Sequence, residues 1–209
     1  LLSNGEGTHP QAPCELIKVA KNTDNAPIDS LSTQTVAFSH YTNVSAQLPI
    51  DPTSGQLVAG GIAEQTAQCL TNIKAILTSI AVGVDDIVKI NISLTNLADI
   101  AAVDDVYSTF FPDTAIARAV NYLPARTVTM VSGLPMGALV QIEAVLSHGD
   151  GTPPQAVEDR HGIVIKTNNT EQAPKHLLST QTVAFSHYNH LSGQLPINPK
   201  TGKLIGSDI

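Results

Sequence analysis

Histidine and cysteine side chains are the residues of this chain whose chemistry suits metal binding or nucleophilic attack. His187 and His190 are three residues apart, so in an extended strand they point to opposite faces and cannot share one metal ion. Cys69 lies on an apolar stripe at helical spacing, which predicts a buried core position. Cys14 lies in a proline- and glycine-containing string typical of a linker. We therefore expect no metal site and no cysteine nucleophile.

Composition and charge exclude several classes of protein. The chain has 209 residues, a net charge of −7 and 11 basic residues, whereas nucleic-acid-binding surfaces need clustered lysine and arginine. Two cysteines are too few for a disulfide framework. No apolar run approaches the roughly 18 residues of a membrane span. The sequence predicts an acidic globular protein that binds neither nucleic acid nor membrane and whose expected location is cytoplasmic.

Part of the sequence occurs twice. Residues 31–50 read LSTQTVAFSHYTNVSAQLPI and residues 178–197 read LSTQTVAFSHYNHLSGQLPI, which differ at four positions and are 147 residues apart. A weaker match relates residues 1–12 to residues 145–156. Matches of this kind indicate repeated structural units.

The two offsets divide the chain into a predicted domain arrangement. We interpret residues 1–8 as the tail of one domain, 15–148 as a complete domain and 161–209 as the opening part of a further one, which suggests a fragment of a tandem array. The alternative is a single protein with one partial duplication. A partial domain cannot bury its apolar face alone, so residues 161–209 are expected to pair either with a neighbouring chain or with a continuation of the sequence.

The complete unit combines alternating and helical patterns. Alternation over residues 88–94 predicts a strand with one buried face, and apolar stripes over 69–80 and 100–110 predict two amphipathic helices. Gly60 opens the turn into the first helix and Gly83 is its expected stop. Further strands are expected over residues 16–20, 35–41, 44–49, 126–131 and 139–146. The order ββ(β)αβαββ predicts an α+β fold with helices on one face of a mixed sheet.

Several strings in this order resemble the RidA/YjgF family of enamine/imine deaminases. They are SAQLPIDPTSGQL, AEQTAQCLTNIKAIL, DDIVKINISLTNL, YSTFF, YLPARTVTMV and LVQIEAVL, and together they span nearly all of residues 15–148. The resemblance implies a chorismate-mutase-like fold that assembles as a trimer with ligand clefts between subunits. It also implies hydrolysis of reactive 2-imino or enamino acids to 2-keto acids and ammonia, without metal or organic cofactor.

The resemblance places four residues in the predicted chemistry. Arg126 stands where the family keeps an arginine that binds the substrate carboxylate, a task suited to its fork of donors. The family's water-activating glutamate aligns with Gln141, which can hold a water but cannot accept its proton. Glu143 is two residues further on the same strand face, roughly 6–7 Å away, and is a possible base. Asp104 replaces a usual asparagine and would repel an anionic substrate unless it pairs with Arg126.

Four further positions complete the expected substrate-binding set. Ser45 matches the family's pocket serine, and Ser192 does so in the second copy of the repeated sequence. Ser32 stands where the family has a pocket tyrosine, so a phenolic hydroxyl is missing there. Val128 stands where many members have cysteine.

These substitutions leave three hypotheses open. The chain is an imine/enamine deaminase acting on a small imino acid, a non-catalytic module that binds a keto acid or similar anion, or a structural repeat of a larger assembly. In each case we expect trimeric packing, as a homotrimer or as a pseudo-trimer of repeats within one chain, because each unit must bury its exposed sheet face against a neighbour.

Overall fold

The structure is a computed structural model. It describes residues 18–38, 41–111, 123–147, 165–185 and 188–206. Cys14 and His187 lie outside the described residues, as does the predicted domain tail at residues 1–8.

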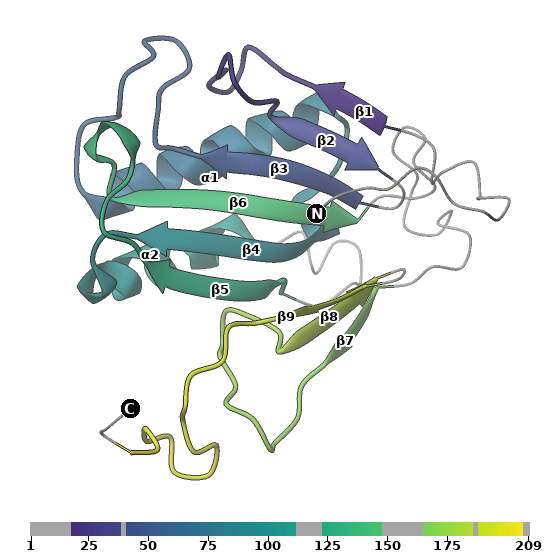
Figure 1. The fold of residues 1–209 in the computed structure, drawn as a ribbon, viewed down its shortest axis with the longest axis vertical. Helices are drawn as coiled ribbons and strands as arrows, with labels where there is room; N and C mark the ends of the chain where they lie inside the picture. Colours follow the sequence, from purple (N-terminus) through teal and green to yellow (C-terminus); the bar gives the residue numbers. More distant parts are fainter. Residues whose placement is uncertain (1–17, 39–40, 112–122, 148–164, 186–187, 207–209) are drawn as a thin grey trace, which may run out of the picture.

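A six-stranded mixed sheet forms the main body of the molecule (Figure 1). Its strand order is β1-β2-β3-β6-β4-β5, in which β4 and β5 are parallel and the other neighbours are antiparallel. The strands are β1 (Lys18–Lys21), β2 (Thr35–Phe38), β3 (Tyr41–Gln47), β4 (Ile87–Leu94), β5 (Ala125–Met130) and β6 (Val140–Ser147). Because β5 is an edge strand of this sheet, the N–H and C=O groups on its outer side are available to another segment.

Two helices, α1 (Ile62–Ser79) and α2 (Ile100–Phe110), lie together on one face of the sheet, behind it in Figure 1. Their apolar stripes pack against the side chains that the central strands direct to that face. The fully buried core includes Cys69, Ile73, Ile76, Leu77, Ile90, Ile92, Val103, Tyr107 and Ile142. Burial of this apolar surface is the main stabilising contribution to the fold.

The ends of α1 follow the predicted turn chemistry at one end only. Gly60 has a φ of +113°, a conformation that favours glycine, and Glu64 Oε2 accepts a hydrogen bond from Gly61 N at 2.8 Å. The predicted stop at Gly83 is wrong. The helix ends at Ser79, and the residue with positive φ is Ala81, at 54°.

The second copy of the repeated sequence forms its own small sheet. Its strands are β7 (Lys166–Asn168), β8 (Thr182–Phe185) and β9 (Tyr188–Leu191), in the order β7-β8-β9. We call residues 18–58 the first copy and residues 165–205 the second copy. Strands β8 and β9 lie beside β4 and β5 (Figure 1), and a buried apolar cluster joins the two sheets through Tyr41, Val88, Ala125, Val183 and Phe185.

The α+β prediction, with a mixed sheet and helices on one of its faces, is confirmed. Helices and strands follow the predicted order through residues 18–147. Within the described part of the chain, no helix combines the length and apolar character that crossing a membrane requires.

Candidate active site

Arg126 lies on edge strand β5 and points to the helix-covered face of the sheet. Its Cα pairs with that of Ile90, a core residue of β4, so the two side chains share a face. On that face the guanidinium Cζ lies 4.7 Å from the centroid of the Tyr107 ring, and Nη2 donates a hydrogen bond to Asp104 Oδ1. The Arg126 side chain is 4% exposed. Strand β5 and helix α2 therefore hold the cation between an aromatic face and a carboxylate.

Two donors of this buried guanidinium lack a partner. Arg126 Nε and Nη1 are buried without a hydrogen-bond acceptor among the described residues, and the hydroxyl of Tyr107 is buried and unpaired as well. Burial raises the pKa of Tyr107, so its phenol is neutral at pH 7. An unpaired buried polar group costs about 1–3 kcal/mol. The two unpaired donors of Arg126, with the unpaired hydroxyl of the tyrosine on which it stacks, form a candidate site for a small anionic ligand.

The second copy holds the backbone that carries Arg126. Ser192 Oγ accepts a hydrogen bond from Arg126 N at 2.9 Å, and Gly193 N donates to Arg126 O at 2.8 Å. Ser192 Oγ in turn donates to Thr180 O at 2.6 Å. A Cβ added to Gly193 would lie 3.2 Å from Thr127 Cγ2, so glycine permits this close approach. The candidate site is thus built from β5 and α2 together with the second copy.

A histidine of the second copy faces the carboxylate of the site. His176 Nε2 lies 3.9 Å from Asp104 Oδ2. His176 Nδ1 accepts a hydrogen bond from Leu178 N at 3.1 Å, so a neutral ring carries its proton on Nε2, toward Asp104. Asp104 pairs with Arg126 and lies between Arg126 and His176.

The structure does not bring Gln141 and Glu143 to Arg126 within the described chain. Residue 144 of β6 and residue 126 of β5 both pair with Ile90, whereas residues 141 and 143 differ from 144 by an odd number. Because side chains alternate along a strand, Gln141 and Glu143 point to the open face of the sheet. Glu143 is exposed and accepts a hydrogen bond from Asn91 Nδ2 at 2.7 Å.

The other predicted positions lie at different places in the sheet. Val128 follows Arg126 by two residues, shares its face and packs against the helical core. Ser45 is on β3, three strands away from β5 and so about 14 Å across the sheet, and it donates from Oγ to Thr33 O at 2.6 Å. Ser32 is exposed in the turn before β2. In this chain the serine that contacts Arg126 is Ser192.

Burial is the main cause of the shifted pKa values of three ionisable side chains outside the site. Cys69 is fully buried, as expected, and burial raises the pKa of its thiol, which makes it a poor nucleophile. Lys89 donates from Nζ to Thr127 Oγ1 at 2.6 Å and to Leu191 O, and burial lowers its pKa. Burial, and then the charge of Lys89, lowers the pKa of His190.

Two residues of the site were not predicted. Tyr107 lies on the apolar stripe of α2, and its position on that stripe gives no sign that its ring also stacks on a cation. His176 stands where the first copy has Asp29. This difference between the copies is the one signal in the sequence that marks His176.

The comparisons with known proteins agree with this architecture. The profile of the family described as Endoribonuclease L-PSP matches residues 23–147. A RutC family protein from Pyrococcus horikoshii is 36% identical over 125 residues, 59% of this chain and 92% of that protein. The 2-iminobutanoate/2-iminopropanoate deaminase of Rattus norvegicus is 34% identical over 139 residues, 66% of this chain and 95% of that protein.

Solved structures give the same result. YyfA from Yersinia pestis, of the conserved Rid protein family, has a TM-score of 0.58 and 37% identity, covering 63% of this chain and 99% of that one. E. coli TdcF with bound serine has a TM-score of 0.56 and 30% identity, covering 64% and 100%. Since the family profile matches more than half of its residues, the chain belongs to the Endoribonuclease L-PSP family, the RidA/YjgF family that its sequence strings resemble.

Proposed function

We propose that the chain hydrolyses small reactive 2-imino or enamino acids to 2-keto acids and ammonia, with Arg126 binding the substrate carboxylate. The observation that carries the proposal is the buried guanidinium of Arg126, whose Nε and Nη1 lack partners among the described residues. Buried cationic donors of this kind suit a carboxylate, because charge-assisted hydrogen bonds are the strong ones. The relative from rat carries the name of this deaminase activity.

The reaction requires the protein mainly to orient the substrate and a water molecule. Water adds to the imine carbon, the carbinolamine loses ammonia, and a keto acid remains, so neither metal nor organic cofactor enters the balance. The family also carries an endoribonuclease name, but a net charge of −7 argues against RNA as a substrate.

Keto-acid release from an imino acid generated in situ by an amino-acid oxidase tests the proposal. We expect the full chain to accelerate release and Arg126→Ala to abolish the acceleration, since the carboxylate then has no cation. Arg126→Lys, which keeps the charge without the planar fork, should recover part of it. Unchanged rates in Arg126→Ala would contradict the proposal.

Gln141→Glu is an internal control for the chemistry. No acceleration by the unaltered chain, with a gain in Gln141→Glu, would show a family site that binds without turnover. In that case the binding-module hypothesis replaces the enzyme.

We also propose that residues 161–209 belong to a second domain of the family, and that domains pack around a trimeric or pseudo-trimeric ring with sites between them. The hydrogen bonds that Arg126 N donates to Ser192 Oγ and that Gly193 N donates to Arg126 O support this, because the second copy contributes to the site on β5. Mass photometry that found only isolated single chains would contradict the homotrimer. The cytoplasmic location stays a prediction, which cell fractionation tests.

A further inference from the structure

The Arg126 site already contains a negative charge. Asp104 Oδ1 accepts a hydrogen bond from Arg126 Nη2, so the pair has a net charge of zero at pH 7. A ligand that carries only a carboxylate is attracted by Arg126 and repelled by the neighbouring Asp104. The pair complements a ligand that bears both charges.

We infer that this site selects ligands with a carboxylate beside a protonated nitrogen, and that Asp104 binds the nitrogen. The inference rests on the proposed role of Arg126 in binding the carboxylate. The ligand class is an α-amino acid or the iminium form of a 2-imino acid, in which positive nitrogen and carboxylate are separated by one carbon. A 2-keto or 2-hydroxy acid of the same shape lacks the cation.

The geometry leaves one oxygen of Asp104 for such a nitrogen. Oδ1 is used by Arg126, whereas Oδ2 lies 3.9 Å from His176 Nε2, beyond hydrogen-bond distance. The Asp104 side chain is 23% exposed and that of Arg126 is 4% exposed. A cationic group arriving from solvent therefore reaches Asp104 directly, while the carboxylate is directed to the buried donors of Arg126.

His176 leaves Asp104 Oδ2 without a hydrogen bond. Its Nδ1 accepts from Leu178 N at 3.1 Å, and its Nε2 lies 3.9 Å from Asp104 Oδ2. The second charge that balances Asp104 comes from the ligand.

Such recognition also favours the reactive form of the substrate. A carboxylate close to an imine nitrogen stabilises its protonated form, and the iminium carbon is the better electrophile for water. Asp104 thereby acts on the same bond that the proposed hydrolysis breaks. The keto acid formed has lost the cation and is bound more weakly, which assists product release.

L-alanine and L-lactate are matched probes, because they differ at one position by an ammonium or a hydroxyl group. Isothermal titration of the full chain should give tighter binding of alanine than of lactate, by about tenfold. In Asp104→Asn, which keeps shape and removes charge, alanine affinity should fall by about tenfold and lactate affinity should rise. Asp105→Asn is the matched control, since Asp105 is exposed on the same helix; it should change neither affinity.

The outcomes separate this inference from the proposed function. If Asp104→Asn changes both affinities alike, or if the unaltered chain does not prefer alanine, the inference is overturned while carboxylate binding by Arg126 stands. If Arg126→Ala leaves both affinities intact, the proposed function is overturned as well. Circular dichroism of Asp104→Asn verifies that the variant is folded before it is titrated.

Discussion

The first and second copies of the repeated sequence have the same local structure in different surroundings. In the first copy, Gln34 Nε2 donates to the carbonyls of Thr23, Ala26 and Pro27, and its Oε1 accepts from Thr23 N at 2.7 Å. In the loop before β2, a buried glutamine side chain therefore supplies the backbone hydrogen bonds that neighbouring strands supply within a sheet.

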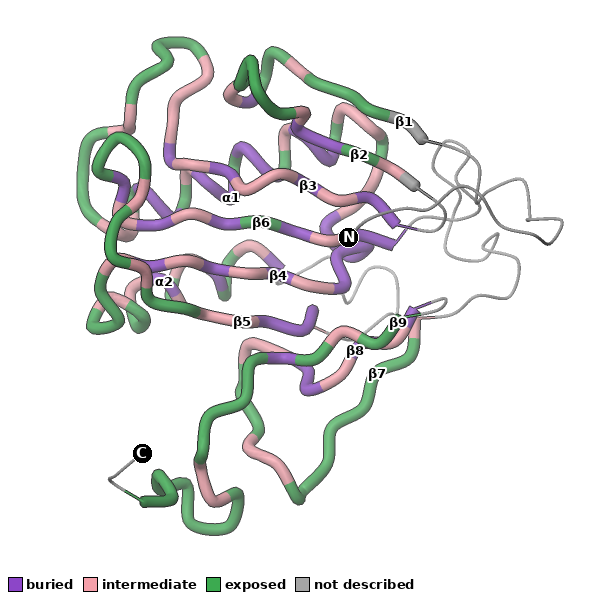
Figure 2. The backbone as a smooth tube through the Cα atoms, in the orientation of Figure 1, coloured by how far each residue is buried: buried purple, intermediate pink, exposed green. Residues whose placement is uncertain are grey.

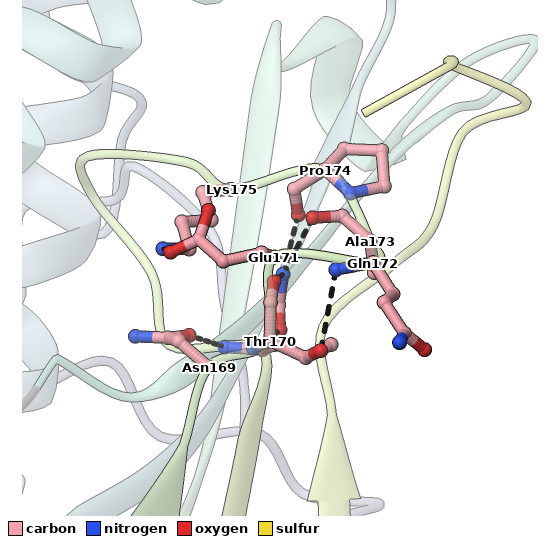
Figure 3. Close-up of polar contacts among 8 residues, drawn as sticks. Asn169, Thr170, Glu171, Gln172, Ala173, Pro174 and Lys175 are labelled. Atoms are coloured by element: carbon pink, nitrogen blue, oxygen red, sulfur yellow. Dashed lines mark hydrogen bonds and ion pairs between the residues drawn. The ribbon is translucent and has the colours of Figure 1, made fainter. Parts of the chain in front are cut away.

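The second copy repeats this arrangement 147 residues later. Gln181 Nε2 donates to Thr170, Ala173 and Pro174, and Oε1 accepts from Thr170 N at 2.6 Å. Figure 3 shows the loop from Asn169 to Lys175 gathered around these bonds. Local sequence is sufficient to form this loop in either setting.

The two copies share these hydrogen bonds but differ in which of their side chains are buried. Leu31 is 93% exposed, whereas its counterpart Leu178 packs against the helical core beside β5. Leu48 is half-buried and its carbonyl accepts a hydrogen bond from Asn72 of α1, whereas Leu195 is 66% exposed. Figure 2 shows the segment that follows β9 mostly exposed. The comparison teaches that local sequence forms the loop, while packing partners decide which residues enter a core or a site.

The largest expected effect comes from removing the loop glutamine. Gln34→Ala should cost about 3 kcal/mol of unfolding free energy, because it leaves one buried and three partly buried backbone groups without the glutamine as their partner. Gln181→Ala should leave the main unfolding transition near its original midpoint and speed amide exchange within residues 165–206. Urea denaturation and hydrogen exchange measure both. Equal losses in the main transition would mean that the two copies unfold as one unit.

Leucine truncation sharpens the difference in burial. Leu178→Ala should destabilise the protein by about 1–2 kcal/mol, because its side chain packs against the core. Leu31→Ala, inside a nearly identical stretch, should have an effect below about 0.5 kcal/mol. Thermal denaturation of the two variants gives the comparison. A loss in Leu31→Ala as large as in Leu178→Ala would indicate that a second molecule covers the first copy in solution.

Ser192 and its counterpart Ser45 in the first copy should differ in their effect on activity. Ser192→Ala removes the acceptor of Arg126 N and should cost about 1–1.5 kcal/mol and lower keto-acid release severalfold. Ser45→Ala removes one bond to Thr33 O and should leave release unchanged. Parallel stability and activity measurements test this. A larger activity loss in Ser45→Ala would place the working site near β3.

Most of the fold was predictable because its signals are local. The stripe that contains Cys69 predicts α1, and the alternation over residues 88–94 predicts β4. The site was less predictable, because the face on which Arg126 lies relative to Gln141 depends on the register of β4 with both β5 and β6. No local pattern contains that register. The contacts between Arg126 and the second copy have the same origin, since they join residues 66 positions apart.

The smallest expected effect concerns Tyr41 and the neighbouring Tyr188, and it is measured as a change of stability with pH. Tyr41 is buried and donates its hydroxyl to Phe185 O, and burial raises its pKa to about 12, whereas Tyr188 is 51% exposed. Because an unfolded tyrosine ionises near pH 10, the neutral Tyr41 contributes stability that is complete below pH 10 and is lost as the pH rises through about 12. Tyr41→Phe should cost about 1 kcal/mol at pH 7 and flatten the alkaline loss. Tyr188→Phe removes an exposed hydroxyl and should change the stability at pH 7 by less than about 0.5 kcal/mol. Urea midpoints between pH 8 and 11 measure both, and identical profiles for the two variants would show that the contact between Tyr41 and the second copy does not form in solution.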